Sequence, residues 1–353
     1  MRRTKPPEFH SEVLLRDTDF AMLDRLLRSE AREHGLDLHD GHGRSTWCQT
    51  EWGEFGAKKR GGDVLIFARA HRPEWLAAMK ETITDHVMAA MPGRALTMRW
   101  SSLADIGKPP ANFSLARAGQ ARRISEDFVR LRLHSPDLTR LASEDSIHFR
   151  LLLPAPGDGR PEWPRVGANG QTNWPAGAKA LHRPVYTIRK INAAEGWLDT
   201  DIYLHSGGRV TQWVLHGAGP FEVGLIGPSG GGIPRTAKLV LAADESGYPA
   251  IARIIEARPQ AQGTVWLMGR RNDYPMPSAP NLEIFHLPEG ADALPAILAS
   301  APPPADAFLW MAAEKGSIAA IRRILLQDPE HDPHLTHLSA YWSRPSADPA
   351  SAE

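Results

Sequence analysis

Acidic and hydroxyl side chains follow an apolar run, residues 237–243, just before a helix that Pro249 should open. They are Asp244, Glu245 and Ser246. Backbone N–H groups at a helix N-terminus and a serine hydroxyl can bind phosphate, and open α/β sheets bind nucleotides at such crossings. We therefore expect Asp244 and Ser246 to contact a nucleotide cofactor. Ordinary N-capping by Ser246 is the alternative.

Two further positions could contact a ligand. Glu314 and Lys315 follow the apolar run 307–313 at the carboxyl edge of the expected sheet, where we expect them to bind the substrate. The helix dipole alone also explains a glutamate there. Gly227 opens a glycine-rich run, residues 227–232, whose backbone N–H groups could cradle a phosphate. That run lacks the spacing of a dinucleotide fingerprint, so a hinge between domains is an equal alternative.

The segment from Arg183 to Arg189 combines two guanidinium groups, an aromatic ring and a hydroxyl on one expected strand. Because side chains alternate along a strand, Tyr186 and Ile188 would face one side while Thr187 and Arg189 face the other. The backbone between them can donate hydrogen bonds to a ring system that lies against Tyr186. A tyrosine in the core and a solvent-facing arginine are the alternative.

The composition excludes several classes of protein. In 353 residues, 41 basic side chains balance 41 acidic ones, so no basic field is present to hold nucleic acid or an anionic membrane. No apolar run approaches the roughly 20 residues of a membrane span. The single cysteine, Cys48, cannot form an internal disulfide, a Cys-ligated cluster or a structural zinc site within this chain. Together with the lack of an apolar leader, this predicts a cytoplasmic protein.

A small α+β domain is expected over residues 1–100. It begins with a strand at 12–16 and a helix that Asp17 or Asp19 caps and Gly35 ends. A second helix starts at Pro73, and residues 95–100 are expected to close the domain as a strand. Residues 101–120 lose this periodicity and are interpreted as a linker.

Two larger domains should follow the linker. Over residues 121–236 apolar side chains alternate with a period of two between glycine- and proline-rich turns, which favours an antiparallel β-barrel. Over residues 237–345 strands alternate with helices, which indicates a mostly parallel, doubly wound α/β domain. The tail, residues 346–353, is expected to be disordered.

Over residues 121–345 the chain resembles the siderophore-interacting protein family, which comprises flavin-dependent ferric-siderophore reductases. The stretches that carry the resemblance are IHFRLLLP (147–154), WPAG (174–177), VYTIR (185–189), DIYLH (201–205), GPSG (227–230), ADES (243–246), WMAAE (310–314) and AYW (340–342). The resemblance implies a ferredoxin-reductase-like order, with an FAD-binding barrel followed by an NAD(P)H-binding-like domain.

The resemblance also implies how FAD would be held. Tyr186 would stack on the isoalloxazine and Thr187 would address its polar edge. The family's pyrophosphate-binding arginine stands two residues before the tyrosine, where this chain has a proline, so Arg183 sits one position early and Arg189 is the better-placed guanidinium. Further flavin contacts are implied along an expected strand, residues 201–213, from His205, Thr211 and Trp213.

For the substrate, the resemblance implies basic side chains around an anionic ferric siderophore. Arg150 replaces the family's lysine, and Arg344 follows the Tyr-Trp pair; ordinary surface residues are the alternative. Iron in a siderophore is already fully ligated, and this sequence contains no metal-ligand motif. A flavin can take two electrons from a nicotinamide and pass them on singly, and ferrous iron binds hard oxygen ligands less tightly.

We therefore expect an FAD-dependent ferric-siderophore reductase supplied by NADH, NADPH or a ferredoxin. A non-catalytic siderophore- or flavin-binding protein and a general NAD(P)H:flavin oxidoreductase are the alternatives. Residues 1–100 resemble a small domain of unknown function often fused ahead of these reductases, notably in HGLDLHDGHGR (34–44). Its histidines, His34, His39 and His42, have no neighbouring ligand partners in the sequence and are expected to be solvated.

Overall fold

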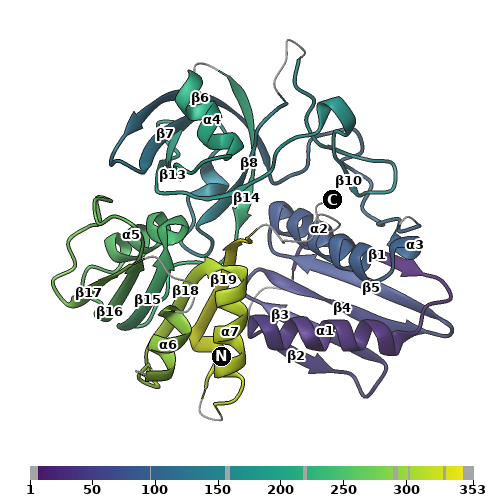
Figure 1. The fold of residues 1–353 in the computed structure, drawn as a ribbon. Coiled ribbons are helices and arrows are strands. Elements are labelled where there is room, and N and C mark those ends of the chain that lie inside the picture. The colour runs from purple at the N-terminus through teal and green to yellow at the C-terminus, as the bar shows by residue number, and fades with distance from the viewer. Residues whose placement is uncertain are drawn as a thin grey trace. The chain divides into compact units, whose positions relative to one another are not determined.

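The computed structural model describes residues 7–95, 97–155, 160–217, 221–288, 293–300, 303–328 and 331–344 (Figure 1). It divides into two compact units. The first contains residues 1–115, 150–184 and 223–229, and the second contains residues 116–149, 185–222 and 230–353. The tail expected to be disordered lies outside the described residues. Within the described part of the chain, no helix is long and apolar enough to cross a membrane.

The first unit opens with a five-stranded antiparallel sheet in the order β1-β5-β4-β3-β2. Two helices, α1 (Phe20–His34) and α2 (Pro73–Ala90), pack on the face that carries Val64, Ile66 and Ala68. The five strands are β1 (Phe9–Leu15), β2 (Asp37–Asp40), β3 (Ser45–Thr50), β4 (Gly53–Arg60) and β5 (Asp63–Ala70).

Helix α1 begins and ends, and helix α2 begins, where their sequences predict. The Asp19 carboxylate accepts the Ala21 N–H at 3.0 Å, and Gly35 adopts the left-handed conformation, with φ of 61°, that ends α1. Pro73 occupies the first turn of α2, where a missing N–H costs nothing. The predicted α+β character of this region is confirmed.

The predicted strand at residues 95–100 is wrong. A short helix, α3 (Pro92–Ala95), precedes residues 97–100, which join no sheet. Met98 and Trp100 are nevertheless buried, and the Trp100 N–H donates to the Asn169 carbonyl at 2.8 Å. The alternating apolar side chains of this segment are buried, but its backbone is hydrogen-bonded to a loop rather than to a strand.

The predicted antiparallel barrel domain contains a barrel-like sheet of seven strands. Its order is β11-β8-β14-β6-β7-β13-β12, and its two terminal strands are separated in the chain only by Ile188 and Arg189, so the sheet curls back on itself. Its strands are β6 (Phe113–Arg123), β7 (Phe128–His134), β8 (His148–Leu152), β11 (Val185–Thr187), β12 (Lys190–Asn192), β13 (Trp197–Tyr203) and β14 (Glu222–Ser229). The start of β6 falls inside the segment interpreted as a linker. Two short strands, β9 (Arg165–Val166) and β10 (Thr172–Asn173), pair separately.

A parallel five-stranded sheet in the order β17-β16-β15-β18-β19 ends the chain. Helix α5 packs on one face, and α6 and α7 pack on the other, so the predicted doubly wound fold is confirmed. The strands are β15 (Lys238–Asp244), β16 (Gln262–Met268), β17 (Leu282–Leu287), β18 (Phe308–Glu314) and β19 (Thr336–Trp342), and the helices are α5 (Tyr248–Ala257), α6 (Ala293–Ser300) and α7 (Lys315–Leu325). β19 was not expected from the sequence.

Candidate functional site

The parallel sheet has a topological switch point between β15 and β18. The chain moves outward from β15 through β16 to β17 and then returns to place β18 on the other side of β15. Doubly wound sheets bind ligands at the carboxyl ends of strands where the order reverses. Asp244 ends β15 and Glu314 ends β18, so the structure brings these two expected site residues to one edge.

Asp244 organises the loop that follows β15. Its Oδ1 accepts the Ser246 N–H at 3.0 Å and the Ser246 hydroxyl, and its Oδ2 accepts the Trp342 Nε1–H at 2.7 Å. Burial raises the pKa of the Asp244 carboxyl despite these donors. The capping residue of this turn is therefore Asp244 rather than Ser246.

Glu314 is the N-cap of α7, which confirms the simpler of its two interpretations. Its Oε2 accepts the Gly316 N–H at 2.6 Å, and its Oε1 accepts the Arg344 N–H at 3.2 Å. Partial burial would raise the pKa of this carboxyl, but the N–H donors of Arg344, Gly316 and Ser317 hold the pKa below its ordinary value. The side chains of Lys315 and Arg344 stay exposed beside it.

The glycine-rich run does not form the expected phosphate cradle at Gly227. This residue lies within β14, and its N–H already donates to the Asn112 carbonyl at 3.0 Å. Gly230 has φ of 71°, and a Cβ there would approach His148 Nδ1 to 2.7 Å. The run contains glycine there because the backbone packs directly against the His148 ring.

The expected flavin-binding strand is shorter than its sequence suggests. β11 ends at Thr187, whose carbonyl accepts the Thr200 hydroxyl at 2.9 Å. Thr187, Ile188 and Arg189 are all buried, so both sides of this segment are covered and Arg189 does not face solvent. Burial raises the pKa of the Tyr186 phenol, which places this ring in an apolar setting beside the exposed Val185.

Two nitrogens of the Arg189 guanidinium bind a carboxylate within the protein. It forms a bidentate pair with Glu256 at 2.6 and 2.9 Å, and its Nε lies 3.7 Å from Asp201. Burial would lower the pKa of this group, but the Glu256 carboxylate more than compensates and raises it. Arg189 therefore links the curled sheet to α5 and does not offer its fork to a phosphate, contrary to our expectation.

Arg183 also has an intramolecular partner. Its guanidinium lies over the Trp174 ring, 4.4 Å from the ring centroid. The stack joins two segments that the resemblance singled out, and it leaves the Arg183 side chain at the surface. Arg150 is exposed as well, and both arginines are close enough to Glu81 of α2 to oppose the rise that burial causes in the pKa of that carboxyl.

The strand expected over residues 201–213 is wrong beyond Tyr203. Residues Arg209–Gly217 form helix α4, which contains Thr211 and Trp213. The Thr211 hydroxyl accepts the His205 N–H at 3.3 Å, and the rings of Tyr203 and His205 stack with centroids 6.2 Å apart. Glycine at 207 and 208 lets the chain turn sharply into the helix.

Sequence reasoning missed the N-terminus of α4 as a candidate phosphate site. The signal was present, because a Gly-Gly pair leads into a segment whose Val210, Thr211 and Val214 fall on one helical face. Helix N-termini present N–H groups to anions, and Arg209 lies in the first turn. The His205 ring, which stacks on Tyr203, lies just before this helix and is hydrogen-bonded through its backbone to Thr211.

Comparisons with known proteins find two matching family models and several similar structures. The model of the siderophore-interacting FAD-binding domain matches residues 117–232, and the model of the siderophore-interacting protein matches residues 236–345. A siderophore utilization protein from T. fusca is 25% identical, with a TM-score of 0.57 over 67% of this chain and 94% of that chain. The siderophore-interacting protein SipS from Aeromonas hydrophila is 19% identical, with a TM-score of 0.56 over 68% of this chain and 94% of that chain. A search of the curated proteins finds no match.

Proposed function

Because this chain belongs to the siderophore-interacting protein family, we propose that it is an FAD-dependent ferric-siderophore reductase that releases iron as Fe(II) in the cytoplasm. The coarser statement, a flavin-binding oxidoreductase related to siderophores, follows from the family. The finer statement rests on the residues at the two candidate sites.

One observation carries the proposal. The residues that follow Tyr186 and Thr187 are hydrogen-bonded to α5, the helix that begins just after the Asp244–Ser246 turn. Arg253 of α5 donates to the Ile188 carbonyl, and Glu256 of the same helix binds Arg189. A flavin on β11 and a nucleotide at the switch point would thus be held by one compact unit, as electron transfer between them requires.

The residues that would hold FAD are assigned as follows. The Tyr186 ring would lie against the isoalloxazine, while the Thr187 side chain would face its polar edge. The expected contact from Ile188 is wrong for its backbone, because its N–H donates to the Ile147 carbonyl at 2.9 Å and its carbonyl accepts from Arg253. The first turn of α4, together with Thr211, would meet the pyrophosphate, with His205 and Trp213 beside it. FAD bound there would accept an electron pair from a donor and pass electrons singly to iron.

The donor would bind at the switch point. Asp244 holds the loop at Ser246 in place, and Glu314 fixes the start of α7, so the backbone N–H groups of both turns are preorganised. Lys315 adds an exposed positive charge for a phosphate. The nicotinamides NADH and NADPH fit this chemistry, and a ferredoxin is the alternative donor.

The ferric siderophore is the substrate, and its iron keeps the ligands that the siderophore supplies. Arg150 and Arg344 are exposed and cationic, as recognition of an anionic chelate requires. Each would attract an anionic chelate through its own charge. Fe(II) binds hard oxygen ligands less tightly than Fe(III), so reduction favours release.

Purified full-length protein tests the proposal. It should carry FAD or take it up, bleach on reduction under anaerobic conditions, and regain colour when a ferric siderophore is added, with Fe(II) appearing in a ferrous chelator. Protein that cannot be loaded with FAD would overturn the proposal. Quenching of fluorescence from the 11 tryptophans without Fe(II) would favour a binding protein, and preferential reduction of added free flavin would favour a general flavin reductase.

A further inference from the structure

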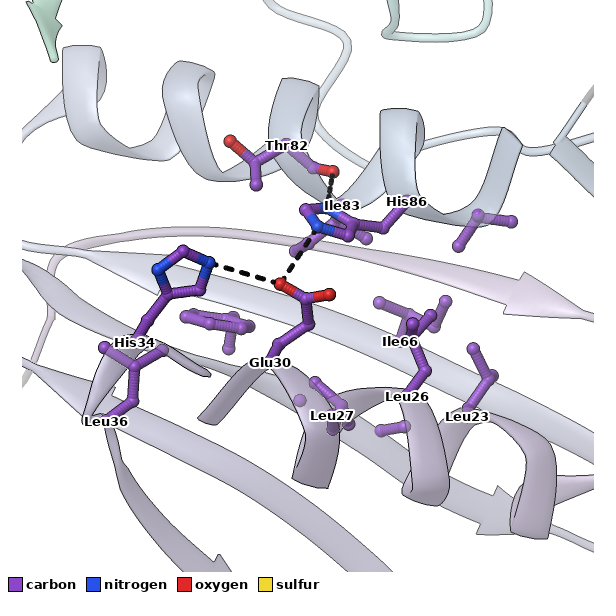
Figure 2. A pocket seen from close by; sticks show the side chains of 14 residues that line it. Leu23, Leu26, Leu27, Glu30, His34, Leu36, Ile66, Thr82, Ile83 and His86 are labelled. Atoms are coloured by element: carbon purple, nitrogen blue, oxygen red, sulfur yellow. Dashed lines mark hydrogen bonds and ion pairs between the residues drawn. The ribbon is translucent and has the colours of Figure 1, made fainter. Parts of the chain in front are cut away.

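The N-terminal domain contains a cavity of about 150 Å³ between its two helices and its sheet (Figure 2). None of its lining residues belongs to the candidate flavin, nucleotide or siderophore sites. Most of them are apolar, from α1, α2, β4, β5 and the turn after α1: Leu23, Leu26, Leu27, Leu36, Phe55, Gly56, Ala57, Ile66, Ile83 and Val87. The cavity is therefore suited to an apolar body.

A polar group closes one end of this cavity. Glu30 Oε2 lies 3.1 Å from His86 Nε2 and 3.5 Å from His34 Nε2, and Figure 2 shows the carboxylate between the two rings. The Glu30 side chain is 24% exposed, whereas those of His86 and His34 are 38% and 50% exposed. The structure shows no group of three or more His, Cys, Asp or Glu side chains able to hold a metal among the residues it describes.

The orientation of the His86 ring is set by its own helix. His86 Nδ1 lies 2.7 Å from the Thr82 carbonyl, which can only accept a hydrogen bond, so Nδ1 is the donor. This leaves Nε2 facing Glu30 Oε2, which also lies beside His34. One carboxyl oxygen of Glu30 is therefore occupied by the two histidines.

The second carboxyl oxygen of Glu30 determines the ligand's chemistry. Oε1 has no hydrogen-bond partner among the described residues, and Figure 2 shows it turned away from both histidines. It can accept a hydrogen bond from a ligand. An anion would be repelled by this carboxyl oxygen, and the apolar lining disfavours a charged body, so a neutral group that donates a hydroxyl hydrogen bond is favoured.

The size of the cavity limits the body that carries this hydroxyl. Cavities of about 150 Å³ lined by leucine, isoleucine and phenylalanine bind a single benzene ring in other proteins. We propose that the N-terminal domain binds a small neutral aromatic alcohol of the phenol class. Its ring lies among the leucines of α1, and its hydroxyl donates to Glu30 Oε1.

Isothermal titration of the full-length protein with phenol tests this inference, with benzene, benzoate and benzylamine as comparators. Phenol should bind more tightly than all three. If benzoate or benzylamine binds more tightly than phenol, or if phenol does not bind, the proposal is wrong. This comparison needs no variant and does not depend on FAD or on a siderophore.

Two variants and one control locate the site. Glu30→Leu should weaken phenol binding about tenfold while leaving benzene binding within about twofold, because only the hydrogen bond is lost. Leu26→Phe should abolish binding of both by filling the cavity, and Arg25→Ala, on the exposed side of α1, should change neither. Unaltered phenol binding in Glu30→Leu that retains the wild-type circular dichroism would overturn the assignment. If either variant fails to fold, the comparison of the four ligands on the wild-type protein decides.

Discussion

The indole N–H of Trp342 donates a hydrogen bond to Asp244 Oδ2 at 2.7 Å. The two residues end β19 and β15, which lie on opposite sides of β18. This hydrogen bond links the end of β19 to the end of β15 at the switch point. The Arg344 N–H forms a second hydrogen bond, to Glu314 at the end of β18. The carboxyl edge of the sheet is thus shaped by residues about 100 positions apart in the chain.

Replacing Trp342 with Phe should lower the free energy of unfolding by about 1 kcal/mol near neutral pH. The loss should grow with pH. Burial already raises the pKa of Asp244 above its unfolded value, so this group favours folding at low pH and loses that contribution as pH rises through its folded pKa. Removing a donor raises the folded pKa further.

Urea unfolding at pH 5 and pH 7.5 measures this effect. In the Asp244→Asn background, the loss of unfolding free energy caused by Trp342→Phe should be the same at both pH values, because no carboxylate remains to titrate at position 244. An equal loss at both pH values in the protein with Asp244 intact would contradict the assignment.

Replacing Arg189 with Met should destabilise the protein by about 3 kcal/mol, because it removes the partner of Glu256 and a neighbour of the fully buried Asp201. Lys190→Met is the matched control, since Lys190 is exposed and lies 3.7 Å from the same glutamate. Chemical denaturation compares the two. A loss at Arg189 no larger than that at Lys190 would show that the buried pair is not structural.

Lys80 should make stability depend on pH above neutrality. Burial lowers the pKa of Lys80 to about 8. Between that value and the unfolded pKa of about 10.4, the unfolded chain binds more protons than the folded protein, so stability rises with pH. With solvent screening taken into account, the free energy of unfolding should rise by about 2 kcal/mol over this pH range, and Lys80→Met should abolish that rise. Lys59→Met, on the exposed part of β4, should leave the rise unchanged. Thermal unfolding from pH 7.5 to 10 checks both.

The Cys48 thiol should be almost inert in the native protein. Burial, with a smaller contribution from the Glu30 charge, raises the pKa of this thiol to about 11. Since the thiolate is the nucleophile, reaction with a disulfide reagent at pH 8 should be roughly a hundredfold slower than in the urea-unfolded chain. Equal rates in the two states would place the thiol at the surface.

Two sets of substitutions should separate cofactor binding from substrate binding. Replacing Tyr186 and Thr187 together with Ala should strip the protein of flavin, which absorbance near 450 nm reports. Arg150→Glu should keep the colour but raise the apparent KM for an anionic ferric chelate roughly tenfold, because it reverses a surface charge. Flavin retention in the double variant would move the flavin site away from β11.

The sequence alone determined the features that depend on neighbouring residues. Caps at Asp19 and Gly35 and a proline at position 73 set the helix ends, and the change of periodicity after residue 236 indicated the doubly wound sheet. Each of these signals acts within a few residues of the structure that it specifies.

Tertiary structure decided the features that depend on distant partners. Residues 97–100 alternate like a strand, but Trp100 finds a loop carbonyl, and α4 forms where a strand was expected. Arg189 looked suited to a phosphate until Glu256, 67 positions away, occupied its fork. A guanidinium binds the carboxylate or phosphate that the fold places beside it. The residues next to the arginine in the sequence do not indicate which anion that will be.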